Sequence, residues 1–142
     1  MSVRILLVED DPLDASMIKE ELEAQLKATV SVIKTEGEFV SRFEEIAKAP
    51  PDLIVLDVML RWAVPSPDLT EDSIPAEVRE EGFYTAGLRC VDRLEKDNRT
   101  QNIPSIIYTG LDKNNFAKRV VHTKSEDLTP LVHEIRKVLA LR

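Results

Sequence analysis

The chain has 142 residues, the size of a single globular domain with its own hydrophobic core. Hydrophobic residues make up 43% of it and charged residues 32%, with only four glycines, which excludes collagen-like, low-complexity and disordered chains. The net charge of -7 argues against direct nucleic-acid binding, because such binding depends on clustered Lys and Arg. The single cysteine, Cys90, excludes an internal disulfide, and its place in a helical pattern favours a buried small hydrophobe.

The amino terminus enters an apolar strand pattern at once. No stretch of the sequence is long enough for a signal-peptide core or a membrane span. We therefore expect a cytoplasmic protein that does not insert into a membrane.

The first third of the chain has the pattern strand, helix, strand, helix. Residues 3–8 predict a strand, and Asp11-Pro12 offers an N-cap and a first-turn proline for the helix that follows. Residues 29–33 predict a second strand, and apolar residues at helical spacing over 39–47 predict a second helix.

The remaining segments continue this alternation. Residues 53–57 and 103–108 are apolar without alternation, which is typical of central parallel strands covered on both faces. A helical stripe over 83–96 lies between them. A short apolar pair at 120–121 predicts a last strand, and Thr129-Pro130 predicts the cap of a last helix.

Five strand-helix repeats predict an α/β fold: a doubly wound, five-stranded parallel sheet of order 2-1-3-4-5 with helices on both faces. We expect residues 1–142 to form one domain. Residues 61–81 do not fit the repeat and are interpreted as a long inserted loop, either functional or locally disordered, in which 75–81 has the pattern of a short helix. Trp62 in this loop is either an interaction anchor or a tether that packs the loop down.

Acidic residues follow two strands that are neighbours in this order. Glu9 and Asp10 end the first strand and Asp57 ends the third, so their carboxylates should share one crevice at the rim of the sheet. Like charges this close need a cation, and hard oxygen ligands select Mg²⁺, Mn²⁺ or Ca²⁺ over zinc. A metal here could bring a phosphoryl group to a nucleophilic carboxylate. Thr109 and Lys124, after the fourth and fifth strands, would add a hydroxyl and an ammonium that can bind phosphate oxygens.

These motifs resemble the receiver domain of two-component response regulators, a flavodoxin-like fold. The resemblance is carried over nearly the whole chain by residues 5–12, 56–60, 108–110 and 123–124. It implies that Asp57 accepts phosphate from the phosphohistidine of a histidine kinase or a histidine phosphotransfer protein.

The resemblance also implies a ligand set for Mg²⁺, with Mn²⁺ as a substitute. Asp10 would bind the metal directly and Glu9 through water, with Asp57 and the Met59 carbonyl completing the protein ligands. Thr109 and Lys124 would each take a phosphate oxygen. Asp11 is assigned first to helix capping and second to the acidic pocket.

The chain departs from the receiver pattern near its carboxyl end. Ser125 follows Lys124 where receivers usually have proline, so the junction should be trans and the reach of Lys124 is open. Val121 replaces the usual aromatic residue that responds to phosphorylation. The polar stretch 111–119 indicates a shortened or missing fourth helix, whose signalling surface the inserted loop would replace.

Three classes of function compete for this sequence. The leading hypothesis is a stand-alone phosphoacceptor that assists its own phosphotransfer and dephosphorylation without being an enzyme, and that signals by contact with a target protein. The alternative is an adaptor whose contacts do not depend on phosphate. A phosphatase is disfavoured because Met59 stands where a second acid would be, and flavin binding because the loop after the first strand is acidic.

Overall fold

The computed structural model of this chain describes residues 2–110, 121–124 and 127–141, with the backbone alone at positions 71 and 121–123. Three of the expectations fall outside the described residues: the shortened fourth helix over 111–119, the side chain of Val121, and the junction with Ser125.

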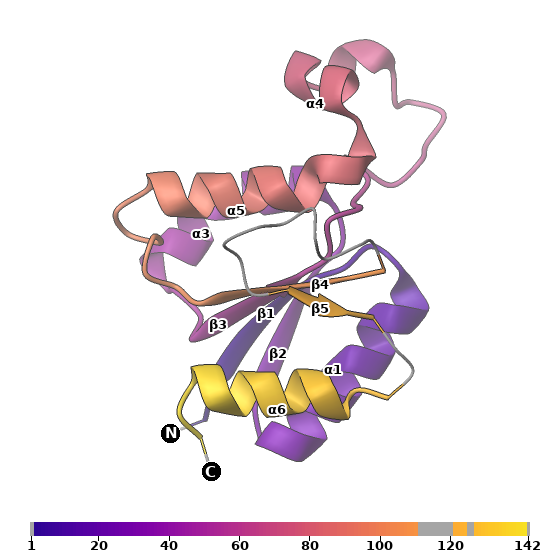
Figure 1. Cartoon of the computed structure of the whole chain (residues 1–142). Coiled ribbons are helices and arrows are strands. Elements are labelled where there is room, and N and C mark those ends of the chain that lie inside the picture. The colour runs from indigo at the N-terminus through magenta and orange to yellow at the C-terminus, as the bar shows by residue number, and fades with distance from the viewer. Residues whose placement is uncertain (1, 111–120, 125–126, 142) are drawn as a thin grey trace.

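A five-stranded parallel sheet of order β2-β1-β3-β4-β5 forms the centre of the molecule, which confirms the predicted fold class (Figure 1). The registers pair Val8 with both Ile33 and Leu56, so β1 ends level with its two neighbours. The strands are β1 (Arg4–Val8), β2 (Thr29–Ile33), β3 (Leu53–Leu56), β4 (Ser105–Thr109) and β5 (Val121–Thr123).

Helices cover both faces of this sheet (Figure 1). α1 (Pro12–Leu26) and α6 (Thr129–Val138) lie on one face, while α2 (Glu36–Ser41), α3 (Phe43–Lys48) and α5 (Ala86–Lys96) lie on the other. Alternate residues of each central strand point to opposite faces, so Ile5 and Leu7 join one core and Leu6 and Val8 the other.

The predicted N-cap of α1, Asp11, is confirmed, and the predicted N-cap of α6, Thr129, is wrong. The side chain of Asp11 accepts hydrogen bonds from the main-chain N–H groups of Leu13 and Asp14, at 2.9 and 3.1 Å. In α6, Thr129 is already a helical residue, and its N–H donates to the Asp127 carboxylate at 2.9 Å. The N-cap position is Leu128, which makes no side-chain cap hydrogen bond, and Asp127 satisfies the N–H of the first helical residue instead.

The helix predicted over 39–47 is two helices. α2 begins earlier, where the Thr35 hydroxyl accepts from the Glu38 N–H at 3.0 Å, and it ends at Ser41. Arg42 then leaves the helical region, with φ -99° and ψ 7°, before α3 begins. The apolar spacing gives no warning of this break, because Phe39 and Ile46 on either side of it are buried in the same core.

The segment between β3 and α5 contains η1 (Glu71–Ser73), α4 (Ala76–Glu81) and η2 (Phe83–Thr85), and α4 stands away from the sheet (Figure 1). The short helix expected at 75–81 is thus present. The helix expected to begin at Phe83 begins at Ala86 instead. Phe83 is exposed and belongs to a turn of 3-10 helix, so its assignment to the buried stripe was wrong.

Candidate functional site

Parallel pairing of β1 with β3 brings Glu9 and Asp57 to one edge of the sheet. The main-chain N–H of Asp57 donates to the carbonyl of Val8 at 3.0 Å, and the N–H of Glu9 donates to Ile33 at 2.9 Å. Both acids therefore continue the ladders of their strands, and both side chains are buried. The winding of the sheet reverses here, where α/β proteins place their ligand sites.

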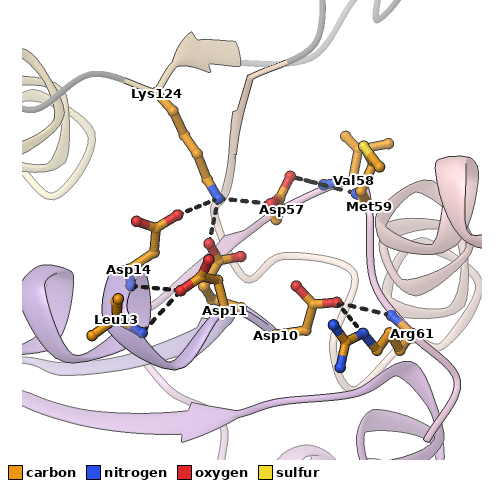
Figure 2. Close-up of polar contacts among 10 residues, drawn as sticks. Asp10, Asp11, Leu13, Asp14, Asp57, Val58, Met59, Arg61 and Lys124 are labelled. Carbon is orange, nitrogen blue, oxygen red and sulfur yellow. Dashed lines mark hydrogen bonds and ion pairs between the residues drawn. The ribbon is translucent and has the colours of Figure 1, made fainter. Parts of the chain in front are cut away.

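Lys124 is the cation at the centre of this edge (Figure 2). Its main-chain N–H donates to the Thr109 carbonyl at 2.9 Å, which extends the pairing of β4 with β5. Its Nζ donates to Asp57 Oδ2 at 2.8 Å, to Asp14 Oδ2 at 3.2 Å and to Glu9 Oε1. The sequence left open whether Lys124 reaches the acidic residues when Ser125, and not proline, follows it. In this structure its ammonium contacts Asp57, Asp14 and Glu9.

Glu9 is the most buried of these acids, with 1% of its side chain exposed. Desolvation raises the pKa of Glu9 to about 8; Lys124 opposes this shift and the nearby charge of Asp57 adds to it. Its second oxygen, Oε2, is buried and has no hydrogen-bond partner among the described atoms. A buried carboxylate oxygen without a partner is unstable unless the group is protonated or meets a cation.

Asp57 is oriented by the backbone that follows it. Oδ1 accepts from the Val58 N–H at 2.7 Å and lies 3.4 Å from the Met59 nitrogen, while Oδ2 accepts from Lys124. These contacts hold the carboxylate in one orientation at the rim. Thr109 is buried at the end of β4, and Met59 is 38% exposed.

Asp10 turns away from Lys124 toward the segment after β3 (Figure 2). Its Oδ2 accepts from the main-chain N–H of Arg61 at 3.2 Å, and the Arg61 Nε lies 3.9 Å from the same oxygen. In the part of the chain that the structure describes, no three His, Cys, Asp or Glu side chains are grouped as a ready metal site.

The donor set nevertheless suits Mg²⁺ by its chemistry. It consists of carboxylate oxygens at the carboxyl edge of the sheet, and one of them is Glu9 Oε2, which has no hydrogen-bond partner among the described atoms. The residues therefore fit the metal, with Arg61 sharing the Asp10 carboxylate through Oδ2.

Three residues at this edge were not singled out from the sequence. Asp14 contacts Lys124, and its signal was available, because it lies in the first helical turn, three residues after the Asp11 cap. Arg61 gave no signal, since its loop lacks periodicity. Gly87 lies within the helical stripe predicted over 83–96, and that pattern gives no sign of a contact with the Asp57 loop.

Gly87 joins α5 to the Asp57 loop. Its N–H donates to the Val58 carbonyl at 2.8 Å. A Cβ at this position would lie 2.1 Å from the Asp57 carbonyl oxygen and 2.7 Å from the Val58 Cα. Only glycine allows this approach, so the start of α5 rests directly on the backbone of Asp57.

The inserted segment is anchored to the helices beside the site. The main-chain N–H groups of Glu36 and Gly37 each donate at 2.8 Å, to the carbonyls of Arg61 and Trp62. A Cβ on Gly37 would lie 2.5 Å from the Trp62 carbonyl and 3.3 Å from its ring. Trp62 therefore packs onto α2, in agreement with the interpretation of this residue as a tether.

A second anchor is a buried ion pair. The guanidinium of Arg89 in α5 donates to both carboxylate oxygens of Glu36, at 2.8 and 2.7 Å, and Glu36 is 1% exposed. Arg89 also contacts Glu81 at 3.1 Å and the Gly82 carbonyl at 3.0 Å. The pKa of Arg89 is raised, first by its hydrogen bonds with Glu36. One side chain thus joins α2, α4 and α5.

No protein-family model and no curated protein match the sequence. Solved structures do match it. A signal receiver domain of a two-component histidine kinase from Clostridium thermocellum aligns with a TM-score of 0.73 and 18% identity, covering 99% of this chain and 100% of that one. The receiver domain of the Francisella response regulator 1452 aligns with 0.68 and 20% identity, covering 98% of each.

A third match is the phosphorylated cyanobacterial phytochrome response regulator RcpA, with a TM-score of 0.63, 21% identity, and coverage of 97% of this chain and 91% of that one. The resemblance indicated by the sequence is thus confirmed at the level of architecture. This chain has the fold of the signal receiver domains of two-component systems.

Proposed function

We propose that this chain is a receiver of a two-component system that accepts a phosphoryl group on Asp57 and signals by contact with other proteins. The observation that carries the proposal is the position of Lys124, whose ammonium contacts Asp57 and Glu9 at the edge of a receiver-like sheet. An ammonium beside the nucleophilic carboxylate is available to bind the phosphoryl oxygens as they arrive.

In this reaction one carboxylate oxygen of Asp57 attacks the phosphorus of a phosphohistidine. The P–N bond breaks, its electron pair leaves with the imidazole of the partner, and an acyl phosphate forms on Asp57. Lys124 shares charge with the transferred group, and Thr109, at the end of β4, is the hydroxyl proposed to take another oxygen. The partner is a histidine kinase or a histidine phosphotransfer protein, and a downstream target protein reads the result.

Glu9, Asp10, Asp57 and the Met59 carbonyl are the groups proposed to hold Mg²⁺, or Mn²⁺ in its place. When bound, the metal would neutralise charge between carboxylate and phosphoryl oxygens. The buried Glu9 oxygen, Oε2, supports this assignment because it has no hydrogen-bond partner among the described atoms. The chain then acts as a phosphoacceptor that assists its own transfer and dephosphorylation, rather than as an enzyme with a turned-over substrate.

Incubation with Mg²⁺ and radiolabelled acetyl phosphate tests the proposal. We expect one acid-stable, base-labile label on the wild type and none on Asp57→Asn. Lys124→Ala should be labelled more slowly or lose the label faster, whereas Lys96→Ala, which breaks an exposed ion pair on α5, should match the wild type. Wild-type protein that takes no label from acetyl phosphate or from a phosphorylated kinase would contradict the proposal and favour the phosphate-independent adaptor.

Among the described residues, none of the helices combines the length and the apolar character needed to cross a bilayer. We propose that the protein acts in the cytoplasm, without direct contact with nucleic acid, for which its net charge of -7 is unfavourable.

A further inference from the structure

Among the described residues, the side-chain contacts of Asp10 are with Arg61 of the inserted segment, 61–81. Figure 2 shows its carboxylate pointing toward Arg61 and away from Lys124. The main-chain N–H of Arg61 donates to Asp10 Oδ2 at 3.2 Å, and the Arg61 side chain brings a positive charge to 3.9 Å from the same oxygen.

The position of Arg61 is fixed by its surroundings. Its carbonyl accepts from the Glu36 N–H at 2.8 Å, and the next carbonyl, that of Trp62, accepts from the Gly37 N–H at 2.8 Å. The Trp62 ring lies against Gly37, so no larger residue fits between the segment and α2. Residues 61–62 are therefore hydrogen-bonded to the start of α2, and this position brings Arg61 next to Asp10.

From this geometry we infer that Arg61 is an intramolecular competitor of the metal ion at Asp10, and that residues 61–62 set the affinity of the site for divalent cations. The inference rests on the metal site of the proposed function and adds its regulation. Arg61 and the metal ion share the single charge of Asp10 and repel each other, so the guanidinium near Oδ2 weakens metal binding and the metal weakens the contact of the guanidinium.

Competition of this kind works in both directions, because a coupling between two binding events is reciprocal. Metal binding weakens the contact of Arg61 with Asp10. Conversely, a protein that binds the inserted segment and draws Arg61 away raises metal affinity and with it readiness for phosphorylation. The segment thereby becomes an input to the site, whereas its expected role from sequence was an output surface.

The size of the effect follows from exposure. The Arg61 side chain is 58% exposed, and exposed ion pairs contribute about 0.2–1 kcal/mol, so removal of the charge should tighten metal binding about 1.5- to 5-fold. The main-chain hydrogen bond from residue 61 remains in such variants, so no larger change is expected.

The experiment measures Mg²⁺ affinity without phosphorylation. Trp62 is the only tryptophan of the chain and adjoins Arg61, so its fluorescence reports on the segment during a Mg²⁺ titration. The rise in thermal unfolding midpoint with Mg²⁺ concentration gives a second measure. The variants are Arg61→Gln and Arg61→Lys. Arg93→Gln is the matched control, because Arg93 is an exposed arginine of α5, paired with Glu77 at 3.3 Å, and its loss changes net charge equally.

We expect Arg61→Gln to bind Mg²⁺ about 1.5- to 5-fold more tightly than Arg93→Gln, and Arg61→Lys to stay near the wild type. Equal affinity of Arg61→Gln and Arg93→Gln, with wild-type binding that Asp10→Asn abolishes, overturns the competition and leaves the proposed function standing. No Mg²⁺ binding by the wild type or by Arg61→Gln overturns both.

Discussion

At the scale of single residues, the site holds two buried carboxyl groups whose negative charges are unfavourable away from water. Glu9 and Asp57 are close, buried and both potentially negative, and one ammonium from Lys124 serves the two of them. Desolvation exceeds the help from this lysine at Glu9, where the pKa is raised. Below about pH 8, Glu9 at this edge of the sheet is therefore more stable in its protonated form unless a further cation binds there.

This arrangement predicts a specific dependence of stability on pH. With its pKa raised from 4.5 to about 8, folded Glu9 holds its proton where the unfolded chain has lost it. Stability from this source is therefore complete below 4.5, and it is lost as pH rises toward 8. In metal-free buffer the free energy of unfolding should fall from about pH 5 to about pH 8, as urea denaturation can measure.

Glu9→Gln is the control for this prediction, since it keeps the shape of the side chain and removes its titration. Its free energy of unfolding should decline less over the same range. Parallel profiles for the two proteins would show that Glu9 does not titrate in this way. Saturating Mg²⁺ should flatten the wild-type profile, because a metal favours the ionised carboxylate.

The residues of the site differ in how far sequence could predict them. Asp57 and Glu9 end apolar strands, so parallel pairing alone brings them together. The contacts of Lys124 depend on the path of its loop, which local sequence does not determine when Ser125 replaces proline. Arg61 lies in a segment without periodicity, and its contact with Asp10 spans 51 positions. The sequence therefore predicts the site residues that directly follow strands, such as Asp57, better than those that lie in loops, such as Arg61.

At the scale of elements, α5 is fitted to the loop that carries Asp57. The hydrogen bond from Gly87 and the absence of a side chain there allow the helix to touch the backbone of Asp57 and Val58. Arg89, half a turn further along α5, binds Glu36 in α2. If phosphorylation moves the Asp57 loop, the movement would act on α5 through the contact with Gly87. Arg89 of α5 in turn contacts Glu36 in α2 and Glu81 in α4.

Gly87→Ala should separate α5 from the loop, because the new methyl group would lie 2.1 Å from a carbonyl oxygen. We expect a loss of about 1–3 kcal/mol in the free energy of unfolding, typical of overpacking, which outweighs the gain of about 0.4–1 kcal/mol from a stiffer unfolded chain.

Gly110→Ala is the matched control, since no described atom lies within 4 Å of a Cβ at that position. It should change the free energy of unfolding by no more than about 0.5 kcal/mol. Chemical denaturation of both variants measures the difference. Equal stability of the two would mean that the close approach of Gly87 is absent in solution.

At the scale of the whole molecule, the sheet divides two cores that sequence periodicity outlined well, because alternate strand residues and helical stripes face predictable sides. The inserted segment is different in kind. Its ends are held by α2 and by the Phe83 carbonyl, which accepts from the Leu60 N–H at 3.2 Å. Within its middle, residues 65–74, the main-chain hydrogen bonds of the described structure are local: the Leu69 N–H donates to the Ser66 carbonyl at 3.0 Å and the Ser73 N–H to the Thr70 carbonyl at 3.1 Å.

Replacement of residues 65–74 by a Gly/Ser stretch of equal length should therefore leave the fold intact. We expect the free energy of unfolding to change by less than about 1 kcal/mol, because the stretch is exposed over most of its length and its hydrogen bonds are local. Urea denaturation gives the comparison, with Arg89→Leu as a destabilised reference that leaves Glu36 buried without its partner. A loss as large as that of Arg89→Leu would place this stretch inside the cooperative unit.

The order in which the pocket is completed has a consequence for synthesis on the ribosome. Strands β1, β2 and β3 and the described acids of the rim, Glu9, Asp10, Asp14 and Asp57, come from the first 57 residues, whereas Lys124 follows Asp57 by 67 positions. A nascent chain can thus assemble a self-repelling acidic edge well before its lysine emerges. Arg61, the first basic residue after Asp57, emerges almost at once. The residue inferred to compete with the metal in the finished protein is thus made before Lys124 and, in the described structure, contacts Asp10 at the same edge.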